Sequence, residues 1–223
     1  NDVFGEKFTV LWNEWLEELG KEQLANLRRL EAEGVTPLTR LTTADFYQTF
    51  PRFMGAHTLY FLRQNNYERA SLQSISLTGK SIAQKVQELN APHFLTIRKN
   101  SPYVIDLEYY RSFSLYSDLH DVLGNRQLTE RLRAVSVDTM PSGDLLLVTQ
   151  EAGLFSLAIH DGTGKHKETL LGPTTRTLAH ARVSPAGDSI VFTARDASTA
   201  ANHLYLLSLK NRELVQLTRE KTT

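Results

Sequence analysis

The most regular pattern of apolar and polar positions lies near the C-terminal end of the chain, over residues 181–218. Residues 189–193 and 204–209 are rich in β-branched, aromatic and leucine side chains, which is typical of buried strands. The sequence Ser184-Pro185-Ala186-Gly187-Asp188 before them predicts a turn, because proline fixes φ and glycine and aspartate tolerate positive φ. With the segment before Pro185 and a last strand at 214–218, this predicts four antiparallel strands, the content of one propeller blade.

The same pattern recurs through most of the chain. Turn segments followed by apolar strands lead into residues 58–62, 103–107 and 145–148 as well. When the copies are aligned on Arg52, His93, Asp138 and Arg182, they are separated by 41, 45 and 44 residues. A fixed period of this kind predicts an all-β propeller over residues 35–223, with four recognisable four-stranded blades at about 43–90, 91–130, 131–172 and 173–219.

Residues 1–34 have a different, helical period. The apolar positions that share one face are Phe8, Leu11, Trp12, Trp15, Leu16 and Leu19. We expect Gly20 to end a first helix and Gly34 to end a second. Two tryptophans on one face require a partner surface. That surface is either the propeller or sequence outside this chain, or else the face binds another protein.

Residues 36–42 carry the pattern of an outer strand, yet no inner strands precede them. This makes one strand too many for four closed blades, so the propeller is predicted to be incomplete. An open arc would leave apolar faces and strand edges unpaired. We therefore expect either further blades encoded outside this chain or self-association that covers those edges.

Composition excludes several classes of function. Lysine and arginine balance aspartate and glutamate at 25 each in the 223 residues, which argues against nucleic acid as a partner. The absence of cysteine excludes disulfides, thiol nucleophiles and cysteine-type zinc sites. No apolar run approaches the roughly 18 residues that a membrane-spanning helix needs.

No constellation of residues points to catalysis. The seven histidines have no chelating spacing with a carboxylate, and no serine lies in a Gly-x-Ser-x-Gly motif. The sequence Gly162-Thr163-Gly164-Lys165 lacks the serine or threonine of a phosphate-binding loop and is better interpreted as a hairpin turn. We predict no catalytic residue, no metal site and no cofactor, and hence a protein that is not an enzyme.

One position deserves a binding hypothesis. Arg52, His93, Asp138 and Arg182 occupy the same place in successive inner strands, which line the central channel of a propeller. Three of the four are basic or become so on protonation, and such side chains form a partly cationic funnel for a carboxylate or a peptide terminus. The alternative is that this position faces a neighbouring blade or solvent.

Residues 181–218 resemble the repeat of TolB-type β-propellers, in which an inner strand is followed by Ser-Pro-Asp-Gly, an aliphatic strand ending in Phe, an Arg-Asp loop and a final Leu-Thr. The matching residues are Ser184, Pro185, Gly187, Phe192, Arg195, Asp196, Leu217 and Thr218, whereas Ala186 replaces the usual aspartate. The match is good in the last blade, fair in the first and third, and poor in the second. The resemblance implies the fold and a periplasmic or other extracytoplasmic location. It leaves function open, because such propellers include binding scaffolds and domains beside peptidases.

The helical segment resembles the last helices of zinc metallopeptidase-like domains that precede such propellers in some bacterial envelope proteins. The resemblance rests on residues 4–8 and 11–16, and the His-Glu-x-x-His zinc motif is absent. Two functions follow as hypotheses. The first is a non-catalytic scaffold that binds a protein or peptide. The alternative is an accessory propeller that gates substrate for a bacterial envelope peptidase whose catalytic domain is not in this chain.

Overall fold

The computed structural model describes residues 7–34, 36, 38–43, 47–79, 82–111, 113–196 and 201–219. The chain divides into two compact units, Asn1–Thr43 and Ala44–Thr223. The first contains the helix α1 (Phe8–Glu33), and the second contains sixteen strands within its described residues.

Helix α1 is continuous through Gly20, so the prediction of two helices is wrong. A glycine inside a helix costs about 1 kcal/mol relative to alanine, which leucine-rich turns on both sides outweigh. The helix ends at Gly34, whose φ of 90° is left-handed. Phe8, Trp12 and Trp15 stack along one face, and no residue of α1 is buried. Residues 4–6, part of the predicted metallopeptidase resemblance, lie outside the described residues.

The predicted outer strand at 36–42 is also absent among its described residues, Thr36 and 38–42, whereas Val35 and Pro37 lie outside the described part of the chain. The guanidinium of Arg40 donates to the carbonyls of Thr42 and Thr43, at 2.7 and 3.4 Å. Those carbonyls are therefore bonded to a side chain of their own segment. A strand pattern without a neighbouring strand does not form a ladder.

The second unit consists of four antiparallel four-stranded sheets, each a simple meander. The first blade contains β1 (Tyr47–Met54), β2 (Thr58–Gln64), β3 (Ser71–Ser76) and β4 (Gln84–Glu88). The second contains β5 (Phe94–Arg98), β6 (Ser101–Tyr110), β7 (Ser114–Asp121) and β8 (Arg126–Gln127). The third contains β9 (Ala134–Thr139), β10 (Leu145–Glu151), β11 (Leu154–His160) and β12 (His166–Thr174). The fourth contains β13 (Thr177–Val183), β14 (Ser189–Arg195), β15 (Asn202–Ser208) and β16 (Leu214–Gln216).

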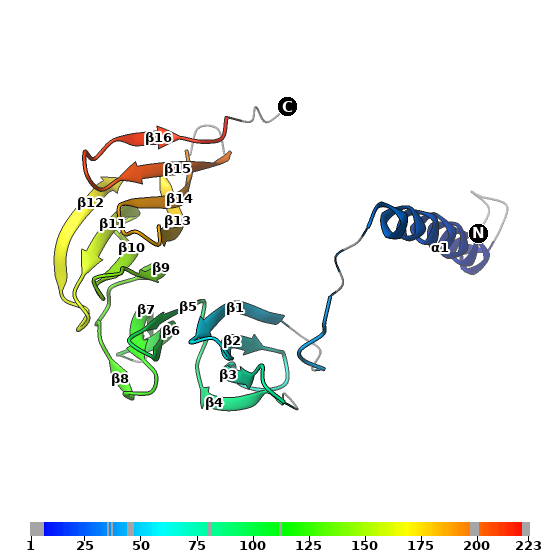
Figure 1. Cartoon of the computed structure of the whole chain (residues 1–223), viewed down its shortest axis with the longest axis horizontal. Coiled ribbons are helices and arrows are strands. Elements are labelled where there is room, and N and C mark those ends of the chain that lie inside the picture. The colour runs from blue at the N-terminus through cyan, green and yellow to red at the C-terminus, as the bar shows by residue number, and fades with distance from the viewer. Residues whose placement is uncertain are drawn as a thin grey trace. The chain divides into compact units, whose positions relative to one another are not determined.

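The blades lie side by side in an arc, with the first strand of each on the inner side and the fourth on the outer side (Figure 1). Contacts between inner strands run from β1 to β5, from β5 to β9 and from β9 to β13. The prediction of an all-β propeller with four blades is confirmed.

Apolar side chains hold successive blades together in three clusters. Between the first two blades, Tyr60, Leu62 and Leu72 pack with Leu95 and Val104. The second and third blades join through a cluster of Phe94, Tyr103, Ile105, Leu119, Ala134, Val137, Leu145 and Leu147. The third and fourth join through Met140, Leu146, Val148, Leu157, Leu178, Ala181, Ile190, Phe192, Ala194 and Leu207. Alternation along β6 and β10 therefore serves two neighbouring blades, one on each face of the sheet.

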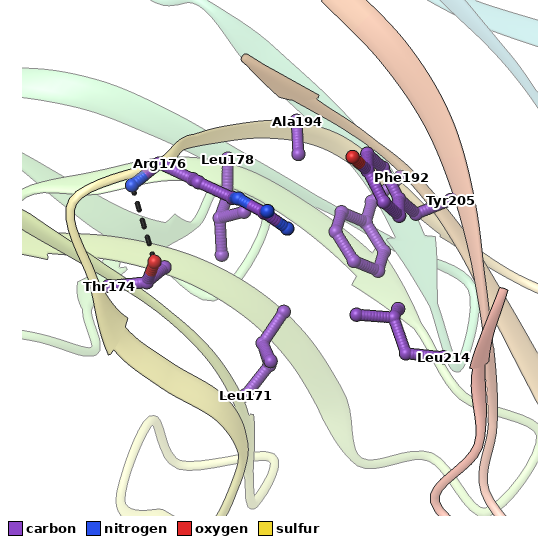
Figure 2. A pocket seen from close by; sticks show the side chains of 8 residues that line it. All are labelled: Leu171, Thr174, Arg176, Leu178, Phe192, Ala194, Tyr205 and Leu214. Carbon is purple, nitrogen blue, oxygen red and sulfur yellow. Dashed lines mark hydrogen bonds between the residues drawn. The ribbon is translucent and has the colours of Figure 1, made fainter. Parts of the chain in front are cut away.

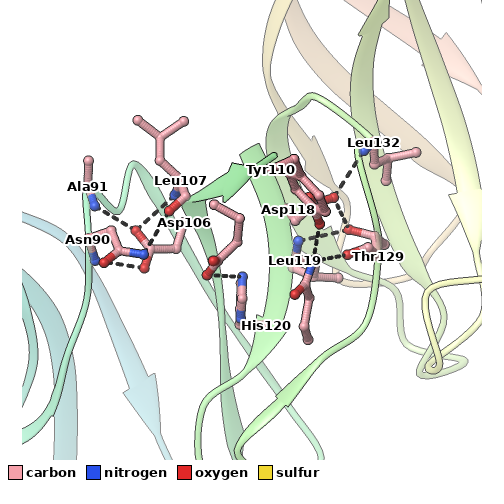
Figure 3. A network of polar contacts seen from close by, with 12 residues as sticks. Asn90, Ala91, Asp106, Leu107, Tyr110, Asp118, Leu119, His120, Thr129 and Leu132 are labelled. Atoms are coloured by element: carbon pink, nitrogen blue, oxygen red, sulfur yellow. Dashed lines mark hydrogen bonds and ion pairs between the residues drawn. The ribbon is translucent and has the colours of Figure 1, made fainter. Parts of the chain in front are cut away.

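Buried aspartates fix the segments that connect the second blade to its neighbours (Figure 3). Asp106 accepts hydrogen bonds from the backbone N–H groups of Asn90 and Ala91, at 2.9 and 2.7 Å. Asp118, with no exposed surface, accepts from the hydroxyls of Tyr110 and Thr129 at 2.9 and 2.8 Å. It also accepts from the backbone N–H groups of residues 131 and 132, at 2.9 and 3.0 Å. Each carboxylate thus supplies acceptors where the chain leaves one sheet for the next.

Replacement of Asp118 by alanine should lower the free energy of unfolding by about 3 kcal/mol or more, because four donors lose their acceptor inside the protein. Urea denaturation followed by circular dichroism measures the change. As a control, Asp188→Ala removes an exposed turn carboxylate bonded to Ser184 and Ser189 and should have a much smaller effect. Equal effects of the two variants would contradict the role given to Asp118.

A second prediction concerns acid stability. His160 is buried, its Nδ1–H donates to the carbonyl of Gly164 at 3.0 Å, and its ring lies 5.4 Å from that of His166. Burial lowers the pKa of His160 below its usual 6.5, and the charge of His166 lowers it further, against the Gly164 bond and Asp161, which raise it. Protonation therefore favours the unfolded chain, so this contribution to stability is complete above pH 6.5 and is lost as the pH falls below it. Unfolding free energies measured from pH 8 to 5 should decline less steeply for His160→Phe than for the wild type.

Candidate anion-binding site

Two of the inner strands contain the same irregularity beside a predicted binding residue. In β1 the pairing register shifts between Thr49 and Arg52, and in β13 it shifts between Ala179 and Arg182. Within these bulges Phe50 and His180 both have φ of 53°, a left-handed conformation that bulky side chains rarely adopt. Arg52 and Arg182 each lie two residues after the left-handed residue of their bulge. Each bulge therefore changes the direction in which its arginine points.

Arg182 lies at the junction of the third and fourth blades. Its Nη1 donates to the carbonyl of Val137 at 3.1 Å and lies 3.7 Å from Oδ1 of Asp138. The guanidinium lies over the ring of Phe94, 5.3 Å from its centroid, so the second blade also contributes. Asp138 in turn accepts a hydrogen bond from the N–H of Val183 at 2.9 Å. These contacts hold Arg182 and Asp138 in fixed positions.

Arg52 extends from the first blade toward the same charges. Its Nη1 donates to the carbonyl of Pro51 at 2.8 Å, whereas its Nη2 is buried and has no hydrogen-bond partner among the residues that the structure describes. Burial and then the charge of Arg182 lower the pKa of Arg52, while Asp138 raises it. Burial lowers the pKa of Arg182 as well, again opposed by Asp138. Two arginines thus share the influence of one carboxylate, which leaves an excess of positive charge and an unused donor.

Aromatic rings form an apolar floor beside the arginines. The ring of Phe94 lies 4.6 Å from that of Phe50 and 5.6 Å from that of His180. Phe94 is almost fully buried, whereas His180 is exposed. Side chains of the first, second and fourth blades therefore meet at one point. Sequence reasoning did not identify these three residues, because a bulge with positive φ at a residue other than glycine has no signature in the sequence.

The structure brings together three of the four residues that the repeat predicted, namely Arg52, Asp138 and Arg182. His93 has a different environment, with Nδ1 3.4 Å from the carbonyl of Ala91 and Nε2 3.3 Å from the carbonyl of Ala134. Its ring therefore lies against backbone at the junction of the second and third blades. The side chain of the second blade that reaches Arg182 is the adjacent Phe94.

A separate hollow of about 100 Å³ lies between β12 and the last blade (Figure 2). Leu171, Leu178, Phe192 and Leu214 line it, and Arg176 closes one side. Arg176 lies over the ring of Tyr205 at 5.8 Å and forms an ion pair with Asp196 at 3.5 Å. The hollow is small and mostly apolar, so the arginines of the inner strands are the stronger candidate for binding.

The part of the chain that the structure describes also bears on metal binding and on membrane insertion. No group of three histidine, cysteine, aspartate or glutamate side chains there lies close enough to hold a metal ion. Within the same residues, no helix is both long and apolar enough to cross a membrane.

No family model matches the sequence, and no curated protein matches it. Among solved structures, the putative TolB from Agrobacterium tumefaciens superposes with a TM-score of 0.58 over 73% of this chain, at 13% identity. TolB from Acinetobacter baumannii superposes with a TM-score of 0.63 over 78% of it, at 11% identity. The chain has the fold of a TolB-type β-propeller. It spans 61% of the first of these proteins and 44% of the second.

A structure described as a prolyl endopeptidase is similar as well. Its TM-score is 0.50, its identity is 12%, and the match covers 72% of this chain and 24% of that one. The likeness to TolB structures and to a peptidase agrees with the predicted TolB-type repeat. At these identities the comparisons establish the fold alone.

The two arginines should respond differently to removal. Arg182→Gln should lower the free energy of unfolding by about 1 to 2 kcal/mol, since it loses the Asp138 pair, the Val137 bond and the Phe94 contact. Arg52→Gln should leave stability unchanged or raise it by up to about 1 kcal/mol, because it removes a buried donor without a partner. Thermal and urea denaturation measure both changes. A loss for Arg52→Gln as large as that for Arg182→Gln would show that Arg52 is a structural residue.

Proposed function

We propose that this chain is a non-catalytic binding scaffold, and that Arg52 and Arg182 bind a carboxylate of a protein or peptide partner. The observation that supports this most directly is the buried Nη2 of Arg52, which has no partner in the described part of the chain although it lies among charged groups. A buried donor left unsatisfied destabilises the free protein, and a bound anion would remove that penalty.

The surroundings of the arginines favour a particular kind of anion. A carboxylate has the planar geometry that guanidinium groups bind by paired hydrogen bonds. The half-buried ring of Phe50 and the exposed ring of His180, both packed on the buried ring of Phe94, offer ring surface beside it. A peptide C-terminus that follows an apolar residue, or an acidic side chain next to one, satisfies both features. Small inorganic anions satisfy only the first.

The fold supports the scaffold role in a general way, since the TolB structures are propellers of the same type. We also propose an extracytoplasmic location, on the basis of the same resemblance. Self-association or further blades would cover the strand edges that the four blades leave at either end of the arc.

A second candidate function is an accessory propeller that admits or positions substrate for an envelope peptidase. The similarity to the prolyl endopeptidase structure favours it, because inter-domain dynamics are described as having a role in the catalysis and specificity of that enzyme. Under this function the arginines would hold the terminus of a peptide substrate. The catalytic groups would belong to a domain outside this chain.

The experiment is a titration of the protein with acetyl-Ala-Leu-Phe that has a free carboxylate, compared with the same peptide as its C-terminal amide. Binding is followed by NMR through the side-chain Nε–H signals of Arg52 and Arg182. The acid should shift both signals and the amide should shift neither. Arg52→Gln should weaken binding of the acid about tenfold, the equivalent of one charge-assisted hydrogen bond.

Arg195→Gln provides the matched control, because Arg195 is an exposed arginine at the end of β14. Its replacement should leave the affinity unchanged. Higher salt concentration should weaken peptide binding by the wild type and by every variant that still binds the peptide. Equal binding of acid and amide, or full binding by Arg52→Gln, would overturn the proposal.

A further inference from the structure

The second blade contains a hairpin that is longer than the sheet to which it belongs. Strands β6 and β7 pair continuously from Tyr103 with Asp121 to Tyr110 with Ser114. Strand β5 covers β6 only from Ser101 to Ile105, and β8 covers β7 only at His120 and Asp121. Within the described residues, the outer part of the hairpin therefore has no further strand paired to either edge, and two-stranded ribbons are only marginally stable in water.

The direction of the backbone groups along β7 can be deduced from one residue. The N–H of Leu119 donates to Oγ1 of Thr129, and its carbonyl accepts from the N–H of Leu128. Leu119 therefore directs its backbone to the outer edge. Because alternate residues of an antiparallel strand face the same neighbour, Leu115 and Ser117 direct their N–H and C=O groups to that edge as well. Strand β8 ends before it reaches them.

The end of the hairpin is also unusually apolar for an exposed segment. The exposed fractions are 94% for Phe113, 69% for Tyr109 and 47% for Leu115. Natural proteins protect free strand edges with charged residues, proline or bulges, because an apolar edge invites pairing with another chain. Here large apolar side chains stand beside an unpaired edge. This combination is typical of a surface that binds an extended segment.

A hollow of about 460 Å³ lies beside this hairpin, and its charged lining consists of two arginines, Arg131 and Arg133, and two carboxylates, Glu130 and Glu151, next to Tyr116. The guanidinium of Arg133 lies 4.7 Å from the centre of the Tyr116 ring, and that of Arg131 lies 5.2 Å from the Tyr110 ring. Stacking holds each guanidinium plane in place while its N–H groups remain available. Arg131 has Glu130 at 3.8 Å, whereas no ion pair neutralises Arg133 among the residues that the structure describes.

We propose that an extended segment of another protein adds to the outer edge of β7 at Leu115 and Ser117, with an acidic side chain bound by Arg133. The added segment continues the position of β8, so that it completes the fourth strand of the second blade. Its backbone bonds to the two free residues of the edge, and its apolar side chains cover Leu115 and Phe113. This surface is distinct from the site at Arg52 and Arg182.

The test uses two synthetic peptides, acetyl-Thr-Val-Glu-Val-Thr-Val-amide and the same peptide with lysine in place of glutamate. NMR of the full chain follows the backbone amides of Leu115 and Ser117, including their rates of hydrogen exchange. The glutamate peptide should slow exchange at both amides and should bind about three- to fivefold more tightly than the lysine peptide. Arg133→Glu should reverse that preference, whereas Arg69→Glu, at an exposed arginine of the first blade, should leave it unchanged.

Ser117→Pro removes an outward N–H without removing a bond to β6, and it should abolish binding of both peptides. If this variant does not fold, N-methylation of alternate peptide groups in the probe supplies the same test on the wild type. Binding that survives N-methylation would overturn the proposal, as would amides of Leu115 and Ser117 that are already protected without peptide. A dimer that forms through this edge at the protein concentrations used would also overturn it, since the occupant would then be a second copy.

Discussion

The structure depends on the burial of apolar blade faces against each other. A twisted four-stranded sheet with apolar side chains on both faces is unstable alone, and here each middle strand supplies one row of side chains to each neighbour. Leu62, Ile105 and Phe192 illustrate this, because each is almost fully buried between two blades. Buried aspartates such as Asp118 complete the arrangement by satisfying the connecting segments. The rigid stack that results fixes the inner strands, whose apolar side chains, such as Leu95, Val137 and Leu178, belong to the same clusters.

That rigidity allows the centre to contain groups that a folding chain would otherwise avoid. One small region contains two residues with left-handed backbone, Phe50 and His180, and a buried donor of Arg52 that has no partner within the described residues. Local strain and unsatisfied polar groups gather at functional sites because the surrounding structure compensates for them. The interblade clusters supply that compensation here. Arg182 has several protein partners, which is why we expect it to contribute to stability, whereas for Arg52 we propose a binding role.

The sequence was sufficient for the propeller, because turn residues and apolar strands repeat at a nearly constant step. The sequence-based prediction was wrong at two places. Residues 36–42 have strand composition, but no strand lies beside them among the described residues, so they do not pair. Gly20 was expected to end a helix, but the leucine-rich turns on both sides of it keep α1 continuous. At the centre, the repeat identified Arg52 and Arg182 but not the ring of Phe94 on which Arg182 lies. The direction of a side chain at a bulge depends on the backbone φ of the bulge residue, and the sequence pattern does not predict these bulges. The sequence pattern also does not predict that two arginines lie near a single aspartate.

The central claim is that Arg52 and Arg182 form an anion site in the free protein. Crystals grown with sodium bromide and measured at the bromine absorption edge would test it directly, because anomalous scattering locates bromide without any assumption about the ligand. The account predicts a bromide ion within hydrogen-bonding reach of Nη2 of Arg52 and of the Arg182 guanidinium, and its displacement by acetyl-Ala-Leu-Phe. Bromide at other surface arginines with none between these two, or a protein acceptor bonded to Nη2 of Arg52, would contradict it.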